Sequence, residues 1–186
     1  DGHPDVDRAR LCHVLADAYA EGAEAAGRSV KRIDVGALDF PLLRTQAEFH
    51  DSAPPPDIAA AQETIAWADH IVILYPLWLG TMPALLKGFV EQVFRPGFAL
   101  DYAGGKFPKG RLSGRSARIV ITMGMPGFVY RWFFGAHSLK SLERNVLKFV
   151  GIRPVSETLF GMVDSADAAK RAQWLVKMQA LGRKGE

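Results

Sequence analysis

The chain has 186 residues, of which 48% are hydrophobic and 23% are charged, a composition typical of one globular domain with its own core. Its net charge of +3 is too small to indicate nucleic-acid binding, and its single cysteine excludes an internal disulfide. No apolar run approaches the roughly 20 residues that span a bilayer. We therefore expect a single domain over residues 1–186, located in the cytoplasm, with no membrane insertion and no nucleic-acid partner.

The first half of the chain alternates between helical and strand patterns. Apolar residues recur at helical spacing in residues 7–26, and residues 29–35 alternate as a strand does. The loop that follows contains three consecutive prolines, which indicate a surface excursion. A helix is predicted over residues 57–70, with Asp57 as its N-cap.

The second half contains two continuous apolar runs, residues 70–76 and 117–124, which are typical of strands buried on both faces. The remaining patterns predict helices over residues 83–94, 137–151 and 165–182 and a strand over residues 154–163. The alternation as a whole predicts an α/β fold, with a parallel sheet covered by helices on both faces.

The chain enters its first helix without a preceding strand, since residues 1–5 read as a loop. In the flavodoxin-like strand order 2-1-3-4-5 the first strand is interior. Its loss would leave backbone groups of two neighbours unpaired, at about 1–3 kcal/mol for each buried group. We therefore expect a doubly wound, parallel, five-stranded sheet whose first strand is supplied by residues upstream of Asp1.

Two arginines, Arg8 and Arg10, fall where the first helix begins. The helix dipole disfavours a cation there by about 0.3–1 kcal/mol. A phosphate bound at the helix N-terminus would explain both arginines. An equally good interpretation is that both point into solvent and pair with Asp5 or Asp7, and the sequence leaves both possibilities open.

Residues 2–7, GHPDVD, are similar to the strand-end metal motif of zinc-dependent deacetylases. The adjacent acidic pair of that motif is replaced by Val6-Asp7, and no second histidine pair with ligand spacing is present. A catalytic zinc needs about three protein ligands. We therefore expect no metal site.

The segment YPLWLGTMPALLKG (75–88) is unusual, because an apolar strand leads into an apolar loop, whereas loops normally face water. Two interpretations are open for Trp78 and Leu79. Either they are core residues under the next helix, or a flat apolar ligand covers the loop.

Three stretches together resemble the flavin-dependent NAD(P)H:quinone oxidoreductases of the DT-diaphorase type, a family that includes the ancillary oxidoreductases of bacterial potassium-efflux systems. They are HPD at 3–5, the PLW…MPALLKG…PGFA pattern within 57–99, and ITMGMPGFVY at 121–130. The resemblance implies a flavodoxin-like homodimer with FMN, or alternatively FAD, as cofactor. It also implies that NADPH or NADH reduces the flavin and that a quinone-like acceptor reoxidises it in a ping-pong cycle.

The resemblance further assigns roles to individual residues. Backbone N–H groups of residues 78–80 would meet the flavin ring, whose edge the apolar loop would shield from water. Tyr130 and His137 resemble a catalytic Tyr–His pair, and Tyr102 and Phe128 would line the substrate pocket, Tyr102 that of the neighbouring subunit. The expected cofactor-binding residues are His3, Arg8, Arg10, Pro76, Leu77, Trp78, Leu79, Gly80, Thr122, Met123, Gly124 and Gly127.

The chain departs from the family pattern in two places. Arg8 and Arg10 replace hydroxyl and amide side chains at the phosphate end, and Met123 and Met125 replace a threonine and a glycine beside the ring. Two other functions are weighed. One is a regulatory flavin-binding subunit of a membrane transport system with little turnover. The other is a one-electron carrier flavodoxin, which is disfavoured because such carriers tend to be acidic.

Overall fold

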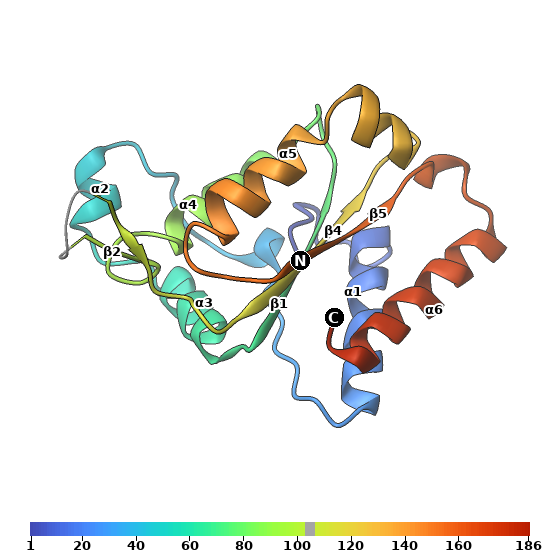
Figure 1. The fold of residues 1–186 in the computed structure, drawn as a ribbon, viewed down its shortest axis with the longest axis horizontal. Helices are drawn as coiled ribbons and strands as arrows, with labels where there is room; N and C mark the ends of the chain where they lie inside the picture. The colour runs from blue at the N-terminus through green and yellow to red at the C-terminus, as the bar shows by residue number, and fades with distance from the viewer. Residues whose placement is uncertain (103–106) are drawn as a thin grey trace.

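The fold is built around a three-stranded parallel sheet (Figure 1). A computed structural model of the chain describes residues 1–102 and 107–186. The sheet contains β1 (His70–Pro76), β4 (Ser116–Thr122) and β5 (Val155–Phe160), in the order β1-β4-β5. The register pairs Tyr75 of β1 with Ile121 of β4. The two continuous apolar runs and the last predicted strand are thus confirmed as strands.

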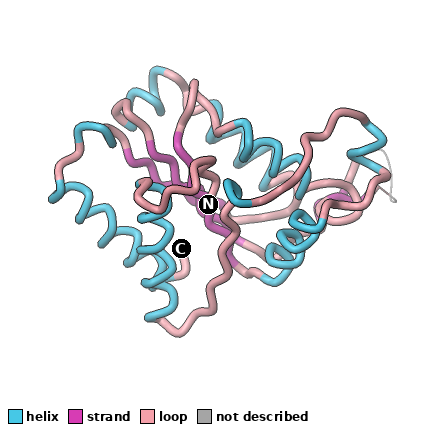
Figure 2. The backbone as a smooth tube through the Cα atoms, turned by 180° about the vertical axis from the view of Figure 1, so that it is seen from behind, coloured by secondary structure: helices cyan, strands magenta, loops and turns pink. Residues whose placement is uncertain are grey.

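Helices cover both faces of this sheet (Figures 1 and 2). One face carries α1 (Leu11–Ala25) and α6 (Ala168–Lys184). The other carries α3 (Pro56–Trp67), α4 (Ala84–Val93) and the continuous helical segment of α5 (His137–Lys140) and η3 (Ser141–Leu147). This arrangement is the doubly wound α/β architecture that the sequence predicts.

Each face of the sheet has its own apolar core, because successive residues of a strand point to opposite sides. Leu74, Val120 and Phe160 pack with α1 and α6. Tyr75 and Ile121 belong to the larger cluster on the opposite face. The strands are therefore buried on both faces, as continuous apolar runs predict.

Helices α1 and α6 approach each other closely through two glycines. A Cβ atom at Gly22 would lie 2.1 Å from the carbonyl oxygen of Gln179, and one at Gly182 would lie 2.1 Å from that of Tyr19. Real Cβ atoms are not tolerated at such distances from backbone. The two glycines therefore set the spacing between the helices.

The predicted strand at residues 29–35 is wrong. This segment is extended but is not a strand of the sheet. Among the described residues, its one backbone partner beyond residues 29–38 is Asp1, whose amine donates to the Ile33 carbonyl (2.8 Å), and it ends in the short helical turn η1 (Val35–Ala37). The Val35 N–H donates to the carbonyl of Asp1 (2.9 Å) and the Gly2 N–H donates to that of Leu74 (2.7 Å). Residues 1 and 2 thus lie between this segment and β1, in the place of the first strand in the order 2-1-3-4-5.

A cavity of about 650 Å³ adjoins Asp1 at this place in the sheet. It lies between residues 28–33 on one side and β1 on the other. Residues 29–32 have no strand beside them among the described residues, and a strand without a ladder partner is not assigned. The sheet of the described residues accordingly has three strands, a modest number that is consistent with the expected fold, whose first strand is predicted to lie upstream of Asp1.

Smaller elements complete the description. Helix α3 begins at Pro56, and Asp57 is not its N-cap but accepts a hydrogen bond from the Asp39 N–H (2.8 Å). The sequence patterns did not predict α2 (Gln46–His50), β2 (Leu100–Asp101), β3 (Lys109–Gly110), η2 (Val129–Phe133) and η4 (Val163–Ser165). Within the described residues, no helix combines the length and the apolar character needed to cross a bilayer.

Candidate functional site

The candidate site lies at the carboxyl ends of the parallel strands, where doubly wound sheets bind their ligands. The Leu77 N–H after β1 donates to the carbonyl of Thr122 at the end of β4 (2.8 Å). The ring centres of His3 and Trp78 are 6.0 Å apart. The Val163 N–H after β5 donates to the carbonyl of Met123 (3.2 Å). The loops after residue 2, β1, β4 and β5 therefore form one connected edge.

The loop after β1 closes in a tight turn at Leu79-Gly80. The flanking residues Trp78 and Thr81 exchange two backbone hydrogen bonds of 2.9 and 3.0 Å. Both central residues have positive φ, +47° for Leu79 and +80° for Gly80. A left-handed conformation is costly for a branched side chain, and such strain concentrates at functional sites.

Trp78 and Leu79 are not core residues. The Trp78 side chain is 49% exposed, and Leu79 is fully exposed at the tip of the turn. Of the three loop N–H groups expected to meet a flavin ring, that of Trp78 already donates to Thr81. The N–H groups of Leu79 and Gly80 have no acceptor among the described residues, so these two are available to a ligand.

The loop after β4 presents backbone atoms to the site, whereas its first side chains are buried. The Thr122 side chain is buried, with Oγ1 3.4 Å from Sγ of Cys12, and the Met123 side chain lies in the core. Gly124 is exposed, and a Cβ there would lie 2.7 Å from Oδ2 of Asp164. A side chain at position 124 would therefore displace the Asp164 carboxylate, whereas glycine leaves that carboxylate beside the loop.

The first turn of α1 presents free backbone donors. The N–H groups of Leu11, Cys12 and His13 have no acceptor in the described part of the chain. These groups and the helix dipole favour an anion. In the preceding loop, Nδ1 of His3 lies 3.1 Å from the Asp5 nitrogen and 3.3 Å from the Asp5 carbonyl oxygen, and these contacts orient the ring. Burial lowers the pKa of His3.

Arg8 and Arg10 form ion pairs with carboxylates of the chain. Arg10 contacts Asp5 at 2.6 Å. Arg8 contacts Asp17 at 2.6 Å and Asp34 at 3.7 Å. Of the two interpretations that the sequence left open, the structure contains the ion-paired one, although the partners of Arg8 lie further along the chain than expected. Both arginines are about half exposed, and such pairs contribute about 0–1 kcal/mol, so a phosphate would displace them at small cost.

Asp1, His13 and Asp34 bring potential metal-ligand atoms within 4.8 Å of one another. The guanidinium of Arg32 lies among them and contacts Asp1 at 2.7 Å and Asp34 at 2.5 Å. The two ring nitrogens of His13 lie 2.6 Å from the Asp1 carboxylate and 2.7 Å from the Asp5 carbonyl. Arg32 thus supplies the positive charge that a metal ion would bring.

Tyr130 and His137 occupy different environments. Tyr130 is buried, its hydroxyl accepts a hydrogen bond from the Leu139 N–H (3.0 Å), and burial raises its pKa. His137 is exposed at the first residue of α5. The hydroxyls of Ser138 and Thr81 are 3.2 Å apart and tie α5 to the loop after β1. His137 therefore stands at the site's surface, whereas Tyr130 supports the helix from beneath.

The two residues expected to line a substrate pocket are far apart. Phe128 is 60% exposed beside the site, followed by the exposed aromatic residues Trp132 and Phe133. Tyr102 adjoins β2, where its ring centre lies 5.7 Å from that of His50 in α2, at the opposite end of the molecule (Figure 1). Tyr102 is thus not part of this chain's site, and its role in a neighbouring subunit stays a prediction.

The sequence analysis missed two site residues, Asp164 and Ser138. Asp164 lies in η4, directly after β5. Thr122 was predicted from the family resemblance; its position at the carboxyl end of a strand is a signal that Asp164 shares. Ser138 carried no comparable signal, because its contact with Thr81 joins segments 57 residues apart.

Comparison with known proteins extends this picture. Residues 1–181 match the model of a family described as having a flavodoxin-like fold. The chain is 35% identical over 75 residues to the ribosyldihydronicotinamide dehydrogenase-like protein of Penicillium crustosum, a match covering 37% of this chain and only 28% of that protein. It is 25% identical to rat NAD(P)H dehydrogenase [quinone] 1 over 91% of this chain and 70% of the rat protein.

The fold is also similar to that of solved structures. The NAD(P)H:quinone oxidoreductase of Methanothermobacter marburgensis superposes with a TM-score of 0.84 at 24% identity. The superposition covers 99% of this chain and 96% of that one. At this level of identity the similarity concerns the fold.

Proposed function

The chain belongs to the flavodoxin-like fold family, and from this premise we propose that it is a flavin-dependent NAD(P)H oxidoreductase that reduces quinone-like acceptors. The turn at Leu79-Gly80 carries the proposal. It holds an apolar side chain in solvent, in a strained conformation, next to two free N–H groups. A flat heterocycle resting on this turn would cover Leu79 and Trp78 and accept those hydrogen bonds.

When bound, a flavin supplies two-electron chemistry between a nicotinamide and a quinone. The loop after β1 would shield the ring from water and direct fixed N–H dipoles at it. Exposed His137 would balance charge at the ring, and Phe128 would contact the acceptor. A shared pocket for donor and acceptor implies ping-pong kinetics.

At the other end of the cofactor, the first turn of α1 would hold a phosphate. Its three free N–H groups and the adjacent Arg10 fit one terminal phosphate, which favours FMN over FAD. Both arginines would first leave their carboxylate partners, Asp5 for Arg10 and Asp17 and Asp34 for Arg8. We propose further that the protein is a homodimer in which Tyr102 of one subunit reaches the other's pocket. We also place it in the cytoplasm, where Cys12 remains a thiol.

An anaerobic titration tests the proposal. The protein reconstituted with FMN should lose its yellow absorbance when NADPH or NADH is added and regain it when a quinone is added. Parallel initial-rate lines in a two-substrate experiment would identify ping-pong kinetics. Flavin that stays oxidised with both nucleotides would contradict an enzymatic role and favour the regulatory subunit.

A matched pair of variants ties the activity to the site. His137→Gln should lower the rate of quinone reduction while leaving FMN bound, because the side chain is exposed and has no structural partner among the described residues. Glu24→Gln, at an exposed position of helix α1, is the control and should leave the rate unchanged. Equal rates in both variants would remove His137 from the proposed site.

A further inference from the structure

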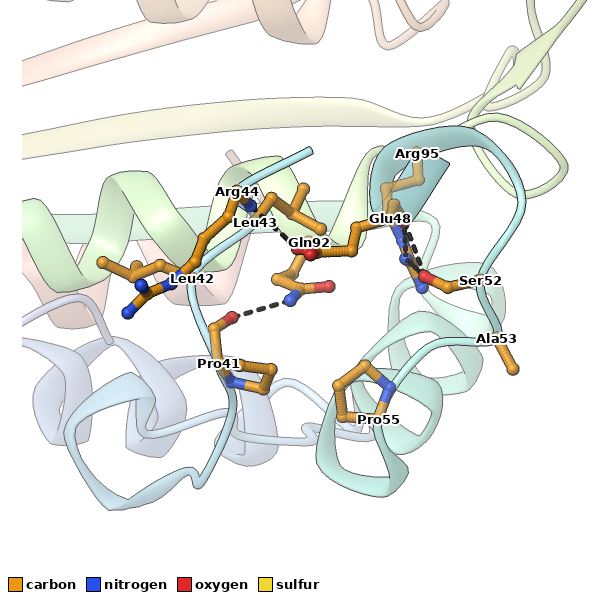
Figure 3. Close-up of a pocket in the computed structure, with 10 residues that line it drawn as sticks. All are labelled: Pro41, Leu42, Leu43, Arg44, Glu48, Ser52, Ala53, Pro55, Gln92 and Arg95. Atoms are coloured by element: carbon orange, nitrogen blue, oxygen red, sulfur yellow. Dashed lines mark hydrogen bonds between the residues drawn. The ribbon is translucent and has the colours of Figure 1, made fainter. Parts of the chain in front are cut away.

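A second cavity lies between the loop of residues 41–55 and helix α4, with a volume of about 310 Å³ (Figure 3). None of its lining residues belongs to the candidate flavin site. The residues that matter for its chemistry are Glu48, Ser52, Gln92 and Arg95, and its apolar walls include Pro41 and Pro55.

Arg95 brings a buried positive charge to this cavity. The residue is only 3% exposed, and its Nη1 donates to the Glu48 carbonyl (2.8 Å) and to Oγ of Ser52 (3.0 Å). No carboxylate lies within 4.0 Å of its guanidinium in the described part of the chain. Burial lowers the pKa of Arg95. A buried guanidinium without a counterion is costly, and an anion would relieve that cost.

Gln92 brings an unused acceptor to the same cavity. It is 2% exposed, and its Nε2 donates to the Pro41 carbonyl (2.7 Å), which fixes the orientation of the amide. The amide oxygen Oε1 has no donor among the described residues. Figure 3 shows this oxygen pointing into the space between Pro41, Pro55 and Ser52. Buried polar atoms are rarely left unpaired, so a donor belongs there.

Bound water would satisfy only one of these two groups. One water molecule could donate to Oε1 of Gln92, but it brings no charge to Arg95. A cavity of 310 Å³ is also roughly ten times the volume that a water molecule occupies in the liquid. The site therefore has room for a small solute that combines an anionic group with a hydrogen-bond donor.

The charges around the cavity define the solute further. Arg44, Arg95 and Glu48 line it, so the cavity carries a formal charge of +1. The Glu48 carboxylate is held by the Arg44 N–H (2.8 Å) and can accept another hydrogen bond. We propose that the cavity binds a small hydroxylated monoanion, such as an α-hydroxycarboxylate or dihydrogen phosphate. The anionic oxygens would face Arg95, and the hydroxyl would donate to Oε1 of Gln92.

NMR titration of ¹⁵N-labelled protein tests this directly. The protein is saturated with FMN beforehand, so that the N-terminus of α1 is not free for anions. The probes are glycolate, acetate, which lacks the hydroxyl, and phosphate at pH 6. Glycolate should bind about fivefold more tightly than acetate, since one neutral hydrogen bond contributes about 1 kcal/mol. The side-chain amide of Gln92 should shift with glycolate and with phosphate.

Substitutions at the cavity provide the second arm. Ala53 lines the mouth and is exposed, so Ala53→Asp and Ala53→Asn should both fold. The aspartate should weaken glycolate binding about fivefold, and the isosteric asparagine should leave it unchanged. Arg95→Gln should weaken it about tenfold or more, whereas Arg144→Gln, on an exposed helical surface, should not. If Arg95→Gln does not fold, the difference in glycolate affinity between Ala53→Asp and Ala53→Asn tests the proposal by itself.

Three results would overturn the inference. The first is equal affinities for glycolate and acetate, and the second is an equal effect of the two Ala53 substitutions on glycolate affinity. The third is a set of chemical-shift changes that does not include the Gln92 amide. The readout is independent of the proposed redox activity, because shifts at Gln92 locate the anion whether or not FMN binds at the strand ends.

Discussion

Two histidines couple the stability of the protein to pH. Burial lowers the pKa of His70, and the nearby cations Arg118 and Arg28 lower it further. Its Nδ1 lies 2.7 Å from Oγ of Ser116, while its Nε2 is buried without a partner in the described chain. The pKa of His3 is lowered too, chiefly by burial. In both cases the folded state resists the protonated form.

We expect the free energy of unfolding to fall as the pH drops through 6.5, the ordinary pKa of histidine. The unfolded chain binds the proton first there, because the folded-state pKa values are lower, and protonation then favours unfolding. Urea denaturation between pH 7.5 and 5.5 measures this. His70→Gln should make the dependence shallower, and His50→Gln serves as the control. A dependence identical in the wild type and His70→Gln would contradict the assignment.

The contacts of Tyr130 stabilise the fold. Its buried hydroxyl is the acceptor for the Leu139 N–H, near the start of α5. Tyr130→Phe leaves that N–H unpaired and should lower the free energy of unfolding by about 1–3 kcal/mol. Tyr102→Phe, at an exposed position, should change it little. Urea denaturation of both variants at pH 7.5 distinguishes them, and equal stabilities would show that the hydrogen bond contributes nothing.

At the scale of the element, the loop after β1 holds Leu79 in a strained and fully exposed conformation, which lowers the stability of the fold. Leu79 has a φ of +47°, a conformation that glycine adopts without strain. Leu79→Gly should therefore raise the free energy of unfolding by about 1 kcal/mol. The same substitution removes the apolar contact that we assign to the flavin ring, so it should weaken FMN binding. Denaturation and fluorescence titration measure the two effects.

The opposite substitution is the control for that argument. Gly80 has a φ of +80°, so Gly80→Ala should lower the stability while leaving Leu79 in place. If Leu79→Gly stabilised the protein without affecting FMN affinity, the turn would be strained for some other reason, and the flavin assignment would lose its main support.

Some elements could be predicted from the sequence and others could not, for identifiable reasons. The strands β1 and β4 were predictable because burial on both faces requires an unbroken apolar run. Residues 29–35 have the alternation of a strand, but a strand exists only where a neighbour completes its ladder. In the described structure only Ile33 and Val35 have such a neighbour, the backbone of Asp1. Helix α2 and the paired strands β2 and β3 are too short for periodicity to show.

Some features of the candidate site could likewise be predicted from the sequence, and others could not. The apolar loop after β1 was visible in the sequence, because its composition is abnormal for an exposed loop. The glycines after β4 were predicted from the family resemblance alone. The partners of Arg8 were not, because Asp17 and Asp34 reach it only through the fold. The burial of Met123 was equally invisible, since it depends on which way the chain turns after β4.

At the scale of the whole molecule, the packing of α1 links the two ends of the proposed cofactor site. The first turn of α1 would hold the phosphate, and the loop after β1 would hold the ring. The orientation of α1 depends on its contacts with the sheet and with α6, which it approaches through Gly22 and Gly182. The distance between phosphate and ring therefore depends on a helix contact far from both.

Gly22→Ala tests this dependence. The added Cβ would lie 2.1 Å from the Gln179 carbonyl, which is backbone and cannot rotate away, so α1 and α6 must separate. We expect the free energy of unfolding to fall by about 1–3 kcal/mol, the usual cost of overpacking. FMN affinity should fall as well, because the shifted α1 carries the phosphate site with it. Glu24→Ala, at an exposed position of the same helix, should change neither quantity. A Gly22→Ala protein of reduced stability but normal FMN affinity would show that the phosphate is held elsewhere than at α1.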